Sequence, residues 1–370
     1  FNTNFRAILT TRVLNKFFTQ EFLYFTKNPQ GKLVTILNTE TKNFCDMFLD
    51  ASIVIISETI ILIAIFTLII VSGKASGFII ILPILFGAGL IVKLLNKKVK
   101  HWASQRVLIS EQLATLSQRI FLSIRDIYFS NNSQQLIKKF FSINQNQSKI
   151  DVYNSTIQLV PKALLEITGL VILLSIIIYF HSSGVSEDII LSNLTFYFVV
   201  AYRAIPSFNR VLIQLQRIKY SKNSLEIIHD ILNLKESRIL SIPDDNKLKF
   251  NKKIRLDNFN FYYQETSKIL KNFNLEIKKN EIVGIYGESG SGKSTLLNLI
   301  TMLIQPNEGK FYLDDKVIVS KNEIRSFQNM ISFISQDTFL IEDTIKNNIL
   351  FYSNEKFNEE RLKFSIDFSN

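Results

Sequence analysis

The stretch that most constrains this chain is 281–303, EIVGIYGESGSGKSTLLNLITML. It begins with an apolar run at 282–286, whose length and branching predict a buried strand. A loop rich in glycine and serine follows at 287–295, and leucine and isoleucine then recur at helical spacing up to Leu303. Strand, glycine loop and helix in this order are the signature of a P-loop, which binds phosphate groups.

The spacing within the loop follows from the chemistry of phosphate binding. Small residues let consecutive backbone N–H groups curl around a β-phosphate, and the helix that starts near Lys293 points its positive end at it. Lys293 would reach the β- and γ-oxygens, and the Ser294 hydroxyl would ligate Mg²⁺. A glycine-rich surface turn is the alternative interpretation. The predicted phosphate-binding residues are Gly287, Glu288, Ser289, Gly290, Ser291, Gly292, Lys293, Ser294 and Thr295.

The composition indicates a membrane part. The 370 residues are 47% hydrophobic and carry a net charge of +11, which is too apolar for an ordinary soluble chain. The basic residues are spread between hydrophobic stretches, as expected for cytoplasmic loops, so nucleic-acid binding is disfavoured. Cys45 is the single cysteine and is interpreted as a small buried hydrophobe. The three histidines are scattered without partners at ligand spacing, which argues against a transition-metal site.

Four stretches are apolar enough to predict transmembrane helices. They form two hairpins with short outer turns, and the long basic segment between the hairpins should lie in the cytosol. An even number of spans returns the chain to the cytosol before the P-loop. The sequence therefore predicts a multi-pass protein of the bacterial inner membrane with a cytoplasmic nucleotide-binding part. The predicted spans are 51–71, 78–95, 164–180 and 189–208.

The remaining patterns predict two domains. Residues 1–235 are expected to be an all-α transmembrane domain, and 236–252 are expected to be a linker. Beyond it, residues 253–263 and 269–277 alternate apolar and polar side chains like antiparallel strands, and 308–318 read as a hairpin. Residues 253–370 are therefore predicted to form a partial α/β P-loop domain with an added β subdomain.

Hydrophobic hairpins fused to a P-loop make the chain resemble an ABC exporter half-transporter. The resemblance implies that Tyr263 stacks on the adenine of ATP, that Gln336 touches Mg²⁺ and the attacking water, and that Thr295 contacts the α-phosphate. A packed strand aromatic is the alternative for Tyr263, and fits Phe261 better. An ordinary polar loop residue is the alternative for Gln336.

The resemblance also implies a partner. The loops at 14–30 and 123–140 occupy the positions of the two coupling helices, the second of which docks on another subunit, so a homodimer is expected. Residues 128–132 are predicted to interrupt the basic helix and make this contact, with a solvated loop as the alternative. The segment 201–232 is similar to lipid-linked oligosaccharide flippases of the PglK type, although peptide and drug exporters also carry a long last span here.

The sequence departs from the family pattern after Gln336. The residues after Gln336 contain none of the family's later motifs: the signature LSGGQ, the strand ending in Asp-Glu, the D-loop and the switch histidine. The chain also has four predicted spans, whereas the family usually has six. We expect a fragment truncated at both ends that hydrolyses ATP poorly, because the general-base Glu is missing. A non-hydrolysing nucleotide-binding membrane fragment is the rival interpretation.

Four charges within the predicted spans lie at about the same depth near the cytosolic boundary. Charged groups in a bilayer usually face the bundle interior. Arg203, with Lys93, is predicted to meet an anionic headgroup, with Glu58 and Glu166 as its partners in the absence of substrate. Structural ion pairing or snorkelling is the alternative.

Overall fold

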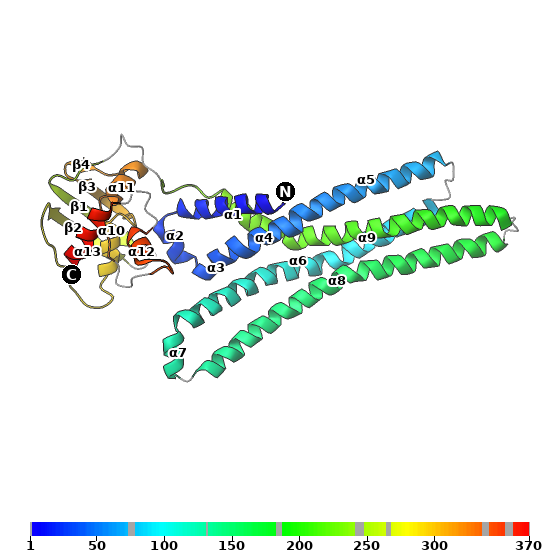
Figure 1. The fold of residues 1–370 in the computed structure, drawn as a ribbon, viewed down its shortest axis with the longest axis horizontal. Helices are drawn as coiled ribbons and strands as arrows, with labels where there is room; N and C mark the ends of the chain where they lie inside the picture. Colours follow the sequence, from blue (N-terminus) through cyan, green and yellow to red (C-terminus); the bar gives the residue numbers. More distant parts are fainter. Residues whose placement is uncertain are drawn as a thin grey trace.

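The computed structural model describes residues 2–72, 78–130, 132–182, 187–240, 248–263, 268–334, 340–351 and 358–369. Long helices make up one end of the molecule, and a smaller region with a sheet makes up the other (Figure 1). This order, a helical region followed by a sheet-containing region, confirms the predicted fold class.

Among the described residues, the helical region has the 17-residue α1, two short connecting helices and four long helical runs. An unbroken run from Gln30 to Val71 contains two π-helical segments, η1 and η2, within otherwise α-helical chain. The elements are α1 (Asn2–Phe18), α2 (Phe22–Lys27), α3 (Gln30–Thr35), η1 (Ile36–Glu40), α4 (Thr41–Asn43), η2 (Phe44–Leu49), α5 (Asp50–Val71), α6 (Phe78–Leu122), α7 (Ile124–Ser130), α8 (Ser133–Ser182) and α9 (Glu187–Leu232).

The long helices pack side by side around an apolar core. α9 contacts α5, α6 and α8, and α6 also contacts α8 (Figure 1). Ala201 and Ala204 of α9 are 2% and 0% exposed, and their small side chains let the neighbouring helices approach closely. The core of this bundle consists of Ile69, Leu165, Ile176, Tyr197, Val200, Ala201, Ala204, Phe208 and Leu212.

The outer surface of the bundle is also apolar. On α5, Ile56 and Ile60 are 63% and 62% exposed, and Ile70 is 67% exposed. Among the residues that the structure describes, the run Gln30–Val71 is long and apolar enough to cross a membrane by length and composition. The other three predicted spans lie inside α6, α8 and α9, and their crossing of a membrane stays a prediction.

The turns at both predicted coupling loops form short helices. The residues 28–31, Asn-Pro-Gln-Gly, predict a tight turn between two helices, and this is confirmed because α2 ends at Lys27 and α3 begins at Gln30. The predicted interruption at 128–132 is right only at its end, since Tyr128, Phe129 and Ser130 belong to α7, which ends at Ser130, and α8 begins at Ser133. These two aromatic side chains are 84% and 87% exposed. The chain turns at the short link between α7 and α8 instead.

The sheet-containing region is built on antiparallel strands in the order β2-β1-β3-β4. Both predicted hairpins are confirmed: β1 pairs with β2, and β3 pairs with β4. Leu256 of β1 is aligned with Leu275 on one side and Phe311 on the other. The elements are β1 (Lys253–Tyr262), β2 (Lys268–Lys278), α10 (Lys293–Ile300), β3 (Glu308–Leu313), β4 (Lys316–Val317), α11 (Lys321–Gln328), α12 (Ile345–Leu350) and α13 (Glu359–Ser369).

One side of this sheet carries a compact core. Phe259, Phe261 and Leu299 are at most 1% exposed, so the strand aromatics pack directly on α10. The buried position of Phe261 agrees with its predicted packing role. The core is completed by Leu256, Met302, Ile304, Phe311, Leu313, Ile318, Ile324 and Phe327.

The strand predicted at 282–286 is not formed. Residues 281–288 have no regular structure, and Ile282 and Tyr286 are 99% and 96% exposed. A strand exists only through hydrogen bonds to a neighbour, and no strand among the described residues lies beside this segment. The sequence pattern gives the segment its tendency to form a strand, but the described part of the chain places no partner strand beside it.

The two regions are joined by more than the connecting chain. Leu23 of α2 packs against the core of the sheet region. The backbone N–H groups of Ser237 and Arg238 both donate to Thr19 O, at 2.9 and 2.8 Å. Lys16 donates to Glu236 across 3.2 Å. The start of the predicted linker 236–252 is therefore docked on the α1–α2 connection, while 241–247 lie outside the described residues.

A buried ion pair fixes three helical segments together. Glu40 at the end of η1 is 0% exposed, and both of its oxygens accept hydrogen bonds from Arg106 of α6, at 3.3 and 3.0 Å. Ser224 of α9 donates to the same carboxylate across 2.5 Å. The Arg106 guanidinium also lies 5.4 Å from the centre of the Tyr220 ring. Burial raises the pKa of Tyr220 to about 12, so this phenol stays neutral.

The predicted partners of Arg203 are wrong. Glu58 binds Arg210 through two hydrogen bonds of 2.5 and 3.2 Å, and Glu166 lies 4.0 Å from Lys162 on the same helix. Arg203 itself is exposed, as is Lys93. Arg203 and Arg210 are seven residues apart, about two turns, so they lie on nearly the same face of α9 but at different levels along it. Glu58 of α5 lies level with Arg210 rather than with Arg203.

Candidate nucleotide-binding site

The glycine loop 287–292 adopts a conformation that needs its glycines. Gly290 and Gly292 have φ of +84° and +91°, in the left-handed region that side chains disfavour. A Cβ on Gly292 would come within 2.8 Å of Ile269 Cγ2, so close packing also excludes a side chain there. Apart from its two chain neighbours, no described residue has an atom within 4 Å of where a Cβ on Gly290 would be, so the loop is open at that position.

The first turn of α10 presents hydrogen-bond donors at the end of this loop. Gly292 is the N-cap of α10 and has no side chain to cap the helix. The amides of Lys293, Ser294 and Thr295 have no acceptor within the helix, because the first turn of any α-helix lacks one. Together with the helix dipole, these donors favour an anion.

Lys293 folds back over the loop. Its Nζ donates to the carbonyl oxygens of Gly287 and Glu288, at 2.8 and 2.7 Å. The loop is braced by a bond from Ser291 N to Glu288 O of 3.2 Å. The exposed loop and the first turn of α10 therefore bring together one cation and several backbone N–H donors. A phosphate group requires this set of donors.

The structure brings Tyr263 to this loop from the end of β1. Its hydroxyl lies 3.4 Å from Thr295 Oγ1, although the two residues are 32 positions apart. The Tyr263 ring packs edge-on against Phe261 at 4.9 Å and is 46% exposed. An aromatic face thus remains open beside the glycine loop, where a base attached to a bound phosphate chain could stack.

The remaining predicted site residues are placed as follows. Ser289, Ser291 and Ser294 are exposed, so the Ser294 hydroxyl is free to approach an ion held by phosphates. Thr295 is 8% exposed, with its hydroxyl toward Tyr263. Gln336 lies outside the described residues. The residues present fit a nucleoside triphosphate, because they combine an open glycine loop, a cation and an exposed aromatic ring.

Two family models match separate parts of the chain. The model described as ABC transporter transmembrane region matches residues 2–140, and the model described as ABC transporter matches 270–368. The first falls on the helical region, and the second contains the glycine loop. The chain belongs to the ABC transporter family. Its resemblance to exporter half-transporters, with a transmembrane and an ATP-binding region in one polypeptide, is thereby confirmed.

Relatives of this ABC transporter chain carry the names of different transport and differentiation proteins. It is 27% identical over 356 residues to the ATP-dependent lipid A-core flippase 2 of Colwellia psychrerythraea, covering 92% of this chain and 58% of that protein. It is 24% identical over 331 residues to the heterocyst differentiation ATP-binding protein HepA of a Nostoc species, covering 89% and 53%. The chain thus spans a little over half the length of these curated relatives.

A solved structure supports the fold. The structure of a bacterial Atm1-family ABC exporter with ATP bound superposes with a TM-score of 0.80 at 15% identity, covering 95% of this chain and 62% of that one. At this identity the similarity concerns the fold alone. It covers both the helical bundle and the sheet region.

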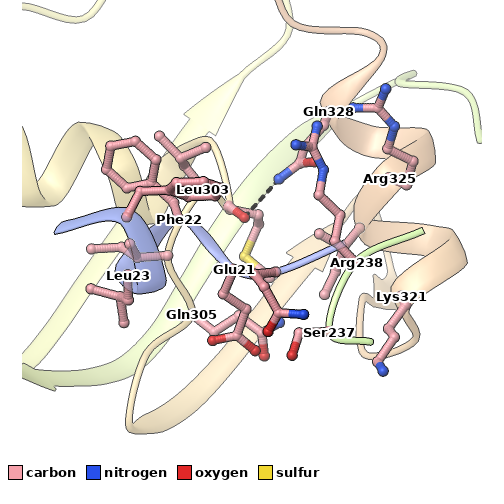
Figure 2. A pocket seen from close by; sticks show the side chains of 15 residues that line it. Glu21, Phe22, Leu23, Ser237, Arg238, Leu303, Gln305, Lys321, Arg325 and Gln328 are labelled. Atoms are coloured by element: carbon pink, nitrogen blue, oxygen red, sulfur yellow. Dashed lines mark hydrogen bonds between the residues drawn. The ribbon is translucent and has the colours of Figure 1, made fainter. Parts of the chain in front are cut away.

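Sequence reasoning missed the joint between the two regions of the transporter chain. Pocket-lining residues from α2, the segment after α9, the end of α10 and α11 meet there (Figure 2). The only local signal was the break at Pro29, which located α2. Nothing in the sequence indicated which residues α2 would face, because those residues are more than 200 positions away.

Proposed function

We propose that this chain is the ATP-binding subunit of an ABC exporter or flippase, which couples ATP binding and hydrolysis to the movement of an amphiphilic substrate across a membrane. The observation that carries the proposal is the docking of α2 on the sheet region, where Leu23 packs into the core that also holds α10. A change at the glycine loop that moves α10 would reach α2 through the apolar core that both contact. A peptide or drug exporter of the same family is the alternative.

The site residues have separate proposed roles. Tyr263 stacks on adenine, and the backbone of 287–293 holds the phosphates while Lys293 neutralises their charge. Thr295 contacts the α-phosphate. Ser294 and Gln336 hold Mg²⁺, which when bound screens the β- and γ-phosphate charge. The exposed Ser294 hydroxyl and the open loop at Gly290 support this assignment.

ATP binding by the purified chain tests these roles. Lys293→Ala is expected to weaken ATP binding by roughly 10- to 100-fold, because it removes charge-assisted hydrogen bonds. Lys310→Ala, an exposed lysine on β3, is the matched control and should leave affinity unchanged. Tyr263→Ala should weaken binding several-fold, whereas Tyr263→Phe should preserve it, since stacking needs only the ring. Equal loss in both Tyr263 variants would reject the stacking role in favour of the hydroxyl.

We further propose that these 370 residues bind ATP without efficient turnover. The sequence contains neither LSGGQ nor a strand ending in Asp-Glu, so it provides no general-base Glu for the attacking water. ATP binding and phosphate release should be measured on the same sample. Turnover at an ordinary enzymatic rate of about 1 s⁻¹ or more, abolished by Lys293→Ala, would contradict this proposal.

The membrane arrangement is proposed from the helices that hold the predicted spans. α5, α6, α8 and α9 would cross the bacterial inner membrane, with the sheet region in the cytoplasm. Because Cys45 is buried at 0% exposure, single cysteines can be introduced as reporters. Ser72→Cys should react with an impermeant maleimide from outside and Ser104→Cys only after permeabilisation. Labelling of both from the same side would reject the topology.

The substrate is proposed to be an amphiphile with an anionic headgroup, such as a lipid-linked sugar or another acidic lipid. Arg203 is exposed on α9, and Arg210 two turns away is held by Glu58. Arg203→Gln should reduce retention of acidic lipid over zwitterionic lipid in the purified chain. Lys162→Gln, whose side chain is 61% exposed on α8, is the control. Equal retention by both variants would remove Arg203 from the substrate site.

The proposed assembly is a homodimer in which α7 contacts the partner. Tyr128 and Phe129 are the exposed aromatic residues at the tip of the bundle, as Figure 1 shows for α7. Phe129→Asp should shift the chain toward monomer in detergent, measured by analytical ultracentrifugation. Phe141→Asp, at 63% exposure on α8, is the control. Unchanged dimer in the Phe129 variant would exclude α7 as the contact.

A further inference from the structure

A small cavity lies at the joint between the helical and sheet regions. Its volume is about 90 Å³, and four segments line it: 20–25 at the start of α2, 237–238 after α9, 302–305 after α10, and α11. Figure 2 shows these segments meeting around it. Since a water molecule takes about 30 Å³ in liquid, the cavity has room for roughly three waters, far too little for a nucleotide.

The charges around this joint cavity are mostly positive. Arg238, Arg325 and Lys321 line it, against a single carboxylate, Glu21. Figure 2 shows Arg238, Arg325 and Gln328 along one side of the cavity, with Glu21 and Gln305 across from them. Lys321 is engaged elsewhere, because its Nζ donates to the backbone oxygen of Glu236. The unengaged cations are therefore the two arginines.

Each arginine has one buried side-chain donor without an acceptor among the residues that the structure describes. The Nε atoms of Arg238 and Arg325 are shut off from solvent and lack an acceptor there. Both residues are half-buried. Burial lowers the pKa of Arg238, and the charge of Arg325 lowers it further. Two like charges close together in a partly buried site raise the free energy of the folded state unless an anion lies between them.

Glu21, the one carboxylate in the lining, is exposed and forms no ion pair with either arginine among the described residues, and two nearby amide groups are engaged elsewhere. Gln328 Nε2 donates to Met302 O across 2.8 Å, and Gln20 Nε2 donates to the carbonyl oxygens of Lys16 and Lys235 at 3.1 and 3.3 Å. A guanidinium offers a planar fork that suits an oxyanion. A hydrated pair of arginines is the ordinary alternative, and it predicts no selectivity among anions.

We propose that the joint cavity binds one small tetrahedral oxyanion of the inorganic phosphate class, held by Arg238 and Arg325. The anion would bridge the segment after α9 to α11, and so fasten the joint through which α2 contacts the sheet region. The cavity is at the other end of α10 from the glycine loop, about 12 Å away for an eight-residue helix. It is thus separate from the proposed ATP site.

The test measures binding of labelled inorganic phosphate to the full chain in lipid nanodiscs by equilibrium dialysis at constant ionic strength. All samples carry Lys293→Ala, so that the glycine loop contributes little. We expect about one phosphate per chain, and at least about tenfold weaker binding on adding Arg238→Gln or Arg325→Gln. Arg255→Gln is the matched control, since Arg255 also has an unpartnered Nε but stacks on Tyr312 away from the cavity.

Two further arms separate the proposal from a general charge effect. Sulfate should compete with phosphate, and acetate at equal concentration should not. Arg238→Lys keeps the charge but loses the fork, so it should bind phosphate several-fold less tightly than the parent chain. Far-UV circular dichroism without phosphate verifies that each variant is folded. Binding that is unchanged in both glutamine variants, equal competition by acetate, or no measurable phosphate in the folded parent would each overturn the proposal.

Discussion

The helical region and the sheet region of this transporter chain differ in where their polar groups find partners. A helix pairs its interior backbone groups within itself except at a proline, such as Pro83 of α6 or Pro206 of α9, and Glu40 finds Arg106 and Ser224 on neighbouring helices. In the sheet region, the strand-like segment 282–286 leaves its backbone unpaired and its apolar side chains exposed. The difference shows that a helix forms its backbone hydrogen bonds within one segment, whereas a strand forms them only with a neighbouring strand.

The largest expected effect tests whether the helical region depends on its buried ion pair. Glu40→Leu leaves Arg106 buried without a counter-charge, so the free energy of unfolding should fall by ~3–5 kcal/mol. Denaturation of the purified chain in detergent, followed by circular dichroism, measures it. Glu40→Leu combined with Arg106→Met should recover much of the loss. Lys222→Leu removes only an exposed pair with Glu226, and a loss no larger than in this control would contradict the prediction.

A comparable loss is expected in the sheet region from its core. Phe259 is 0% exposed, and Phe259→Ala should destabilise this region by ~3–5 kcal/mol through lost burial and the cavity left behind. Limited proteolysis can show that cleavage rises in 253–369 while the long helices stay resistant. Phe368→Ala is the control, because Phe368 is 83% exposed. Equal protease sensitivity of both variants would show that the sheet does not depend on this packing.

A smaller loss of stability is expected at the start of α11. Side chains there bind backbone N–H groups that would otherwise have no partner, as a neighbouring strand does for a strand. Ser320 and Glu323 form a capping box, and Glu323 lies 2.6 Å from Lys316. The Lys316 ammonium, with the Ser320 backbone N–H, lowers the pKa of Glu323 to about 2. Its folded pKa lies below the unfolded one, so this stabilisation is full above about pH 4.5 and is lost as the pH falls toward 2.

The measurement is thermal unfolding as a function of pH. Glu323→Gln keeps an acceptor for the capping box but loses the charge that binds Lys316, so it should cost ~1 kcal/mol near neutral pH, and the difference from the parent chain should shrink on acidification. A constant difference between pH 2 and 7 would show that the charge of Glu323 does not matter.

The smallest effect on stability is expected in the unpaired segment 282–286, and it tests the contrast between the two regions directly. Because Ile282 is 99% exposed, Ile282→Thr should change the free energy of unfolding of this 370-residue chain by less than ~0.5 kcal/mol. Leu299→Thr, on α10 at 0% exposure, should cost several-fold more. A large loss from Ile282→Thr would show that segment 282–286 is packed in solution, and the contrast between the two regions would fail.

The sequence by itself determined the elements whose signal is local. The glycine loop and the helix after it, the break at Pro29, both hairpins, and the long helices holding the predicted spans all follow from residue type and spacing. It also located the candidate ATP site, since phosphate binding depends on consecutive backbone groups within nine residues. The roles of Tyr263, Lys293 and Ser294 remain predictions.

Only the tertiary structure decided which elements meet. Glu58 finds Arg210 across 152 positions rather than Arg203, and Tyr263 reaches Thr295 across 32. Arg238 and Arg325 share a cavity that no local pattern indicates. The physical reason is that periodicity defines the apolar face of a helix or strand, whereas the partner on that face is chosen by the packing of distant segments. For the same reason 282–286 has the sequence of a strand without forming one here.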